Sequence, residues 1–133
     1  APRAVSARPT ALMAPAFARQ VGAAGGAFMA FTSDPTTGNL PYGASKGALD
    51  RVVISAAREL GPRGISANVV NPGPIDTGWM DDGIRTALGG ATPLGRLGSP
   101  RDVAAVVSFL LSEEGRWVSG QLLKSDGAFS AEF

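Results

Sequence analysis

The 133-residue sequence contains neither cysteine nor histidine. Without cysteine there is no disulfide, thiol nucleophile or thiolate metal ligand, and we expect a cytoplasmic protein. Without histidine there is no Ser-His-Asp hydrolase triad, most zinc sites are excluded, and no metal site is predicted. An acid–base group in this chain must therefore be a tyrosine, lysine, aspartate or glutamate.

The sequence also has no large excess of positive or negative charge and no long apolar run. The formal net charge is +1, and the basic residues are scattered among the acidic ones, so no nucleic-acid partner is predicted. The longest nearly continuous apolar run, AAVVSFLL, is shorter than the roughly 18 residues of a membrane-helix candidate, so no membrane partner is predicted either. With 44% hydrophobic residues, the chain has the composition and length of one globular domain.

Apolar spacing predicts helices that alternate with strands. Helices are predicted over residues 9–20 and 42–60, with a short one within 79–90. A fourth helix is predicted to begin after Ser99, because Ser99 suits the N-cap and Pro100 and Asp102 suit the first turn. The first helix carries Leu12, Met13, Ala16 and Phe17 at helical spacing, and the last has a predicted buried face of Val103, Val106, Val107, Leu110 and Leu111. Strands are predicted over residues 27–33, 65–71 and 120–126.

This alternation predicts an α/β fold with a parallel sheet covered by helices. Ligands in such sheets bind beyond the carboxyl ends of the strands, where the predicted loops 34–41 and 72–78 begin. Tyr42, the only tyrosine, and Lys46 lie four residues apart where the helix after the first loop begins, so they share a helix face. An ammonium ~4 Å from a tyrosinate stabilises it by ~4 kcal/mol at a dielectric of ~20. Ser33, at the end of the preceding strand, is placed to hydrogen-bond a substrate oxygen.

The spacing alone leaves two interpretations of this pair open. Tyr42 and Lys46 are either an acid–base pair or a half-buried tyrosine and a nearby lysine at a helix start. The four motifs YGASKGALD, ISANVVNPGPIDTG, GRLGSPRDVAAVVSFLLSEE and VSGQLLKSDG together resemble the short-chain dehydrogenase/reductase family over nearly the whole chain. The resemblance implies a Rossmann-type oxidoreductase that moves hydride between NAD or NADP and a hydroxyl or carbonyl carbon.

The resemblance also implies a role for each matching residue. Tyr42 would be the general acid–base group, Lys46 would stabilise its ionised form and bind the nicotinamide ribose, and Ser33 would hold the substrate oxygen. The loop residues beside the nicotinamide would be Pro72, Gly73, Ile75 and Thr77. A glycine permits close approach, and the threonine hydroxyl can bind the carboxamide.

Several features depart from the family pattern. No Gly-rich strand-to-helix turn occurs, so residues 1–133 are expected to form the C-terminal, substrate-side part of a single Rossmann-like, doubly wound parallel-sheet domain. NAD and NADP are not distinguished, because the residue that selects between them belongs to the absent half. Ser6 matches a position that is usually asparagine, and the loop between Ser33 and Tyr42 is shorter than usual. The segment DGAFSAEF replaces the more usual Gly-Gly.

Two functions remain as hypotheses at this point. The first is an alcohol dehydrogenase or carbonyl reductase acting on a small ketone or an acyl-type 3-oxo substrate. Trp79 and Met80 would then either face an apolar substrate or pack in the core or as a lid. The second is a non-catalytic relative that serves as a folding or oligomer-interaction module. The resemblance implies a homodimer or homotetramer when complete, assembled through helices 9–20 and 42–60 and through the last helix and strand.

Overall fold

A computed structural model describes residues 6–34 and 38–131. Its centre is a parallel three-stranded sheet with the order β1 (Gly26–Phe31), β2 (Ile65–Asn71) and β3 (Leu122–Lys124). Gly26 pairs with Ile65 and Phe31 with Val70, so β1 and β2 end side by side. The structure confirms the predicted α/β fold with a parallel sheet.

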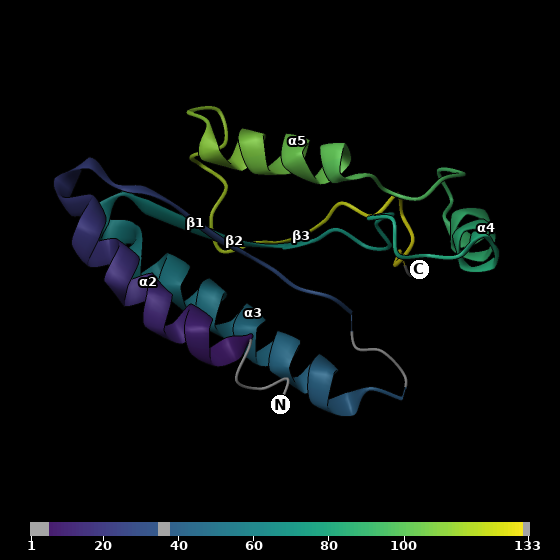
Figure 1. Ribbon diagram of the computed structural model, residues 1–133. Helices are drawn as coiled ribbons and strands as arrows, with labels where there is room; N and C mark the ends of the chain where they lie inside the picture. The colour runs from purple at the N-terminus through teal and green to yellow at the C-terminus, as the bar shows by residue number, and fades with distance from the viewer. Residues whose placement is uncertain (1–5, 35–37, 132–133) are drawn as a thin grey trace.

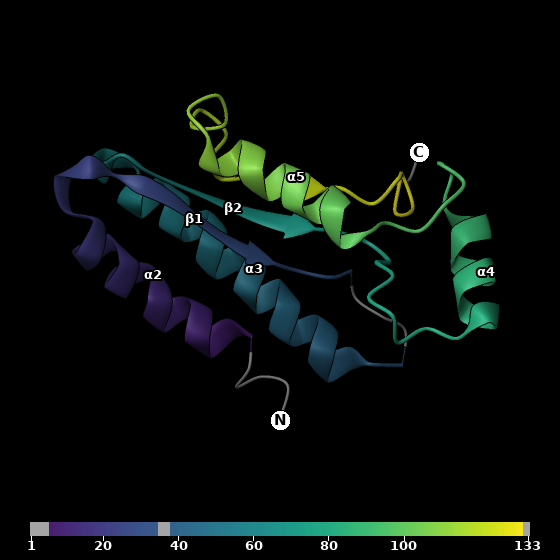
Figure 2. The ribbon, with the colours of Figure 1, turned by 45° about the horizontal axis from the view of Figure 1, so that its top comes forward.

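Helices cover both faces of this sheet. Figures 1 and 2 show α2 and α3 side by side on one face and α5 on the other, while α4 stands beyond the carboxyl ends of the strands. All four helices were predicted from spacing to within a few residues, and two short 3₁₀ turns follow α2 and α3. Their bounds are α2 Ala7–Val21, α3 Leu40–Leu60, α4 Asp82–Ala91, α5 Pro100–Leu111, η1 Gly22–Ala24 and η2 Gly61–Arg63.

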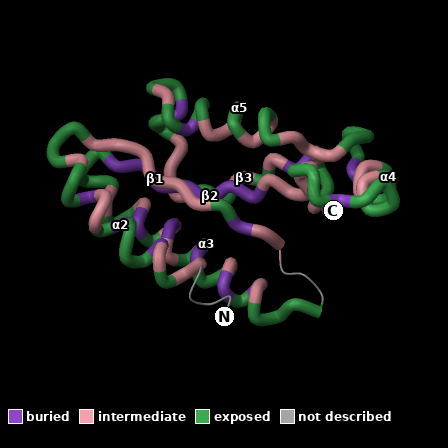
Figure 3. Tube along the Cα trace, viewed as in Figure 1, coloured by how far each residue is buried: buried purple, intermediate pink, exposed green. Residues whose placement is uncertain are grey.

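The core lies between the sheet and α3. Every residue of β2 is buried, because this central strand has a neighbour on each edge and helices on both faces (Figure 3). Residues alternate between the two faces of a strand, and the alternate positions Ala67 and Val69 pack with Leu49 and Val53 of α3. Phe28 and Ala30 of β1 pack against the same cluster.

The face that α2 buries differs from the apolar stripe in its sequence. Phe17 packs on Phe28, with 5.8 Å between the ring centroids, but Leu12 and Met13 are 63% and 60% exposed. The buried residues of α2 are instead the small ones, Thr10, Ala14 and Ala18. Small side chains at four-residue spacing allow α2 to approach α3 closely, which leaves the larger side chains on the outside.

The start of α5 was predicted correctly, and part of its buried face was not. Ser99 and Asp102 form a capping box, in which the Asp102 amide donates to Ser99 Oγ and the Ser99 amide donates to Asp102 Oδ2. Leu110 is buried and Leu111 is 56% exposed, while the other three predicted members, Val103, Val106 and Val107, are partly buried. Neighbouring helix positions point about 100° apart, so only one of the two leucines can face a sheet of three strands.

The cap of α5 should make the stability of the fold depend on pH. Arg96 donates to both oxygens of Asp102, at 2.8 and 2.9 Å, and this contact, followed by the bonds from Ser99, holds the pKa of Asp102 well below its usual value. A carboxylate whose pKa is lowered by folding stabilises the fold above its unfolded pKa and loses this contribution as the pH falls below it. Asp102→Asn should therefore lower the urea midpoint at pH 7, with a difference from the parent chain that shrinks below pH 4. Glu113→Gln, at a carboxylate whose side chain is 83% exposed, is the control, and a difference that does not change with pH would contradict the prediction.

Within residues 6–34 and 38–131, no helix combines the length and the apolarity that crossing a membrane requires.

Candidate functional site

Tyr42 and Lys46 lie where the first turns of α3 meet the end of β1. The helix begins at Leu40, with Pro41 in its first turn, so Tyr42 is near the N-terminus and Lys46 one turn further on. The Lys46 amine lies 5.8 Å from the centre of the Tyr42 ring, within the range of a cation–π contact. The same amine donates a 2.9 Å hydrogen bond to the carbonyl of Phe31, the last residue of β1. Lys46 thus joins the Tyr42 ring to the strand end.

Ser33 lies two residues beyond the end of β1 and is partly buried. The amide before it, that of Thr32, continues the ladder by donating to Val70 O at 2.9 Å. This places Ser33 at the same edge of the sheet as Lys46. Residues 35–37 of the predicted loop lie outside the described residues. Within the described part of the chain, no hydrogen bond joins Ser33 to Tyr42, and the catalytic role of Ser33 stays a prediction.

The loop that follows β2 contains the four predicted cofactor-binding residues. Asn71 Oδ1 accepts from the Gly73 amide, and the Asp76 amide donates to Gly98 O. The Gly98 amide in turn donates to Pro74 O, so the loop is held against the segment that leads into α5. Thr77 is exposed, and the other three are partly buried: Pro72, Gly73 and Ile75. Their contact with a nicotinamide stays a prediction.

Asp126 packs against Gly73 of this loop, a contact that no motif in the sequence predicted. The residue is buried, and a Cβ built on Gly73 would lie 2.4 Å from its Cβ. Burial raises the pKa of the Asp126 carboxyl, but hydrogen bonds donated by Ser130 and by the Ala128 amide outweigh burial and hold that pKa below its usual value. The only signal in the sequence is an aspartate followed by Gly and Ser, a pattern typical of a turn.

Arg85 ties α4 to the same loop, and no motif in the sequence pointed to this residue. Its guanidinium donates to Asp76 at 2.7 Å, to Asp82 at 2.6 Å and to Met80 O at 3.0 Å. The bond from Arg85, followed by the one from the Gly78 amide, holds the pKa of Asp76 below its usual value. The contacts place α4 directly after the predicted nicotinamide loop.

Trp79 and Met80, in the same segment, have different environments. Met80 is buried, whereas Trp79 is exposed. The buried Met80 fits the packing interpretation, and the exposed Trp79 leaves an apolar ring available beside α4.

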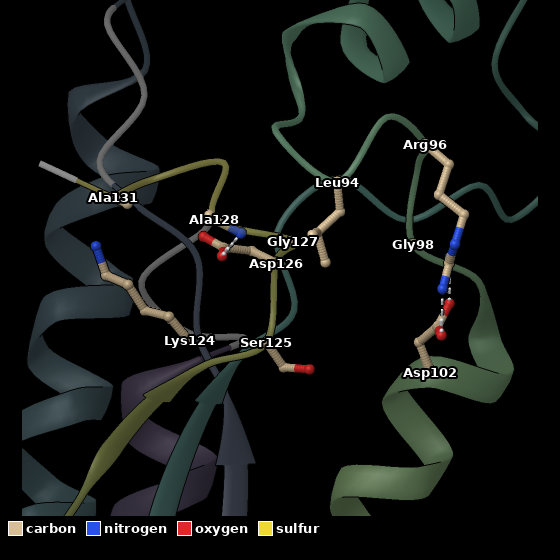
Figure 4. Close-up of a pocket in the computed structure, with 10 residues that line it drawn as sticks. All are labelled: Leu94, Arg96, Gly98, Asp102, Lys124, Ser125, Asp126, Gly127, Ala128 and Ala131. Carbon is tan, nitrogen blue, oxygen red and sulfur yellow. Dashed lines mark hydrogen bonds and ion pairs between the residues drawn. The ribbon is translucent and has the colours of Figure 1, made fainter.

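A cavity of about 470 Å³ lies beyond the carboxyl ends of β2 and β3. Figure 4 shows Lys124 on one side of it, Asp126 in the middle, and the paired Arg96 and Asp102 on the other side. None of the predicted catalytic or nicotinamide-binding residues lines this cavity. The cavity adjoins the loop after β2, because Asp126, which lines it, packs against Gly73 of that loop.

The arrangement offers a defined set of chemical groups at one edge of the sheet. A phenol and an ammonium lie on α3, a hydroxyl follows β1 at Ser33, and a second, exposed hydroxyl follows β2 at Thr77. These groups can exchange a proton with an alcohol or carbonyl oxygen and bind ribose hydroxyls or an amide. The candidate residues thus come from two loops and one helix that the parallel sheet brings to the same edge.

Comparison with known proteins agrees with the family that the sequence motifs resemble. Residues 3–130 match the model of a family described as enoyl-(acyl carrier protein) reductase. The uncharacterized oxidoreductase YjdA of Bacillus subtilis is 46% identical over 71% of this chain and 38% of its own length. A mutant of a short-chain dehydrogenase/reductase of Serratia marcescens is 31% identical with a TM-score of 0.85, over 96% of this chain and 55% of that one.

A third relative was solved with a cofactor. The blue fluorescent protein from a metagenomic library, in complex with NADPH, is 41% identical with a TM-score of 0.71, over 79% of this chain and 45% of that one. The chain thus spans between about two fifths and just over half the length of these three relatives. The match to the family model over nearly all of its residues shows that the chain belongs to the short-chain dehydrogenase/reductase family.

Proposed function

We propose that the chain forms the catalytic, substrate-side part of an NAD(P)-dependent oxidoreductase, which transfers hydride between the nicotinamide and a hydroxyl or carbonyl carbon. The observation that carries the proposal is the position of the Lys46 amine, between the Tyr42 ring and the carbonyl at the end of β1. This is the edge of a parallel sheet where ligands bind. The relative solved with NADPH supports a nicotinamide cofactor.

Each proposed role follows from the chemistry of the side chain. Tyr42 donates a proton to the carbonyl oxygen in reduction and accepts one from the hydroxyl in oxidation. Lys46 places a positive charge beside the Tyr42 ring, and the Ser33 hydroxyl holds the substrate oxygen. The nicotinamide, when bound, supplies or accepts the hydride.

The residues of the second loop suit the polar parts of such a cofactor. Thr77 has an exposed hydroxyl, and the loop offers backbone groups at Pro72, Gly73 and Ile75 that can bind a carboxamide. The Lys46 amine is a donor for ribose hydroxyls. No Gly-rich strand-to-helix turn for a pyrophosphate occurs in the 133 residues, so we expect tight dinucleotide binding to require the first half of such a domain.

The proposed substrate is a small ketone, an alcohol or an acyl-type 3-oxo compound. The family description, which names an acyl-carrier reductase, supports an acyl substrate. The exposed Trp79 beside α4 supports an apolar substrate body. The ties from Arg85 to Asp76 and Asp82 would hold this segment over the substrate.

A chimera tests the function. The first part of the Serratia marcescens short-chain dehydrogenase/reductase, which superimposes on 96% of this chain, is joined to residues 6–133 in place of its own matching region. The oxidation of NADPH is then measured with a panel of ketones and 3-oxoacyl thioesters. We expect cofactor binding by calorimetry and turnover with at least one class, and much weaker binding by the chain alone. A folded chimera that binds neither NADH nor NADPH would eliminate the oxidoreductase proposal and favour a non-catalytic module.

We propose in addition that two copies associate through α2 and α3. The exposed Leu12 and Met13 lie on α2, next to a groove of about 410 Å³ between the two helices. Arg51 and Glu59, about two turns apart on α3, line this groove. A twofold axis that crosses α3 midway between the two residues would bring each arginine to the partner's glutamate.

Charge reversal tests this association. Arg51→Glu should convert the dimer to monomer in sedimentation equilibrium, because it places acidic groups opposite each other. The swapped variant Arg51→Glu with Glu59→Arg should restore the dimer. The same charge reversal at the exposed Arg101 of α5, Arg101→Glu, on the other face of the sheet, serves as the matched control. A dimer that Arg51→Glu leaves intact, or a monomeric parent chain, would disprove this interface.

A further inference from the structure

Five buried side-chain atoms have no hydrogen-bond partner among the described residues, and three of them belong to residues near the carboxyl ends of β1 and β2. These three atoms are Thr32 Oγ1, Ser45 Oγ and Asn71 Nδ2. The three residues are only 5%, 3% and 2% exposed. An unpaired polar group that is buried costs free energy, so native proteins pair such groups with protein or with ordered water.

The fold brings these three residues to one layer. Phe28 and Ala30 of β1 pack toward α3, so Thr32, two residues after Ala30, points to the same face of the sheet. The same alternation takes Ala67 and Val69 to Asn71 on β2. The strands are parallel and in register, and the Thr32 amide donates to Val70 O, so Thr32 and Asn71 lie side by side.

Ser45 closes this layer from the helix side. It lies one turn before Leu49, which packs against the sheet in the core cluster, and residues four apart lie on the same helix face. The apolar core between α3 and the sheet therefore ends in a polar layer at the carboxyl ends of β1 and β2, made of Thr32, Ser45 and Asn71.

The chemistry of this polar layer selects a small neutral ligand. Asn71 Oδ1 already accepts from the Gly73 amide, so the amide orientation is set and Nδ2 remains as a donor. The two hydroxyls can each donate or accept. None of the three groups is charged, so the layer has no means of compensating an ion in the core. A water molecule, with two donors and two acceptors, matches one amide donor and two hydroxyls.

We propose that Thr32, Ser45 and Asn71 form a buried water site that anchors the first turns of α3 to the ends of β1 and β2. The Asn71 amide donates to the water, and the water donates to the two hydroxyls. The site adjoins the contact between Lys46 and the carbonyl of Phe31, because that carbonyl belongs to the peptide bond that ends at the Thr32 amide. The site thus positions Lys46 without touching a substrate.

Removing one hydroxyl at a time tests the proposal in the chain itself. Ser45→Ala and Thr32→Val should each lower the thermal midpoint by about 2–6 °C, because the water loses a partner while the other groups stay buried. Ser108→Ala, at an exposed position of α5, controls for the helix preference of alanine. If the layer is dry, each substitution removes an unpaired buried group and raises the midpoint instead, which would overturn the proposal.

A double variant and a crystal structure supply independent readouts. The combined Ser45→Ala and Thr32→Val variant should lose less than the sum of the single losses, since both residues bind the same water. A crystal structure of the unmodified chain should show solvent density about 2.7–3.2 Å from at least two of the three atoms. Additive losses together with an empty layer would disprove the site. None of these measurements depends on oxidoreductase activity, so a failure here is separate from a failure of the proposed function.

Discussion

Tyr42→Phe is expected to reduce the turnover of the chimera by about 10²- to 10⁴-fold, the usual contribution of a general acid–base group. The phenyl ring can still lie beneath the Lys46 amine, which is 5.8 Å from the ring centre, so the fold and the cofactor affinity should not change. The loss should appear in kcat, because the hydroxyl acts on the reacting oxygen in the transition state. Steady-state kinetics and calorimetry with NADPH measure the two effects separately.

The control for this prediction is Trp117→Phe. Trp117 is 98% exposed and lies in the connection between α5 and β3. It lines a pocket with Gly64 and Ile65 at the amino end of β2, away from the carboxyl ends of the strands. Its replacement should leave both turnover and cofactor affinity unchanged. Full activity in the Tyr42→Phe chimera would remove Tyr42 from the proposed acid–base role, and a loss of cofactor affinity as large as the loss of turnover would assign Tyr42 to binding instead.

Gly73→Ala should have the largest effect on stability of any single change in the nicotinamide loop. Gly73 has a φ of +65°, and an added Cβ would lie 2.4 Å from Asp126 Cβ and 3.1 Å from its Cα. The positive φ costs roughly 1–2 kcal/mol for an alanine. Overpacking typically adds about 1–3 kcal/mol, because Asp126 cannot move aside without disturbing the hydrogen bonds that its carboxylate accepts from the Ala128 and Ser130 amides. The free energy of unfolding in urea measures the sum.

Gly78→Ala separates the two causes. Gly78 has a φ of +90°, but nothing lies within 4 Å of a Cβ at this position. This variant should therefore show the backbone strain alone and be clearly more stable than Gly73→Ala. Equal free energies of unfolding for the two variants would show that Asp126 moves aside freely and that its contact with Gly73 does not hold the loop.

Local patterns in the sequence were sufficient to predict most elements. The apolar spacing of α3, the buried run of β2 and the Ser99 cap of α5 each depend on residues a few positions apart, where propensity and capping act. The alternation of these elements predicted the parallel sheet, and it placed Tyr42 and Lys46 at the edge where ligands bind. The predictions were wrong where the apolar stripe of a helix is wider than the surface packed against it. Leu12 of α2 and Leu111 of α5 belong to such stripes, and the structure leaves both exposed.

By itself, then, the sequence determined the α/β class, the order of the elements and the place of the tyrosine–lysine pair on α3, because short-range hydrophobic periodicity encodes these features. The tertiary structure decided which groups support the pair and its neighbouring loop. Lys46 meets Phe31, Gly73 meets Asp126, and Thr32 lies beside Asn71 only because parallel strands and α3 pack in one register. Such contacts join residues far apart in the chain, and no local pattern specifies them.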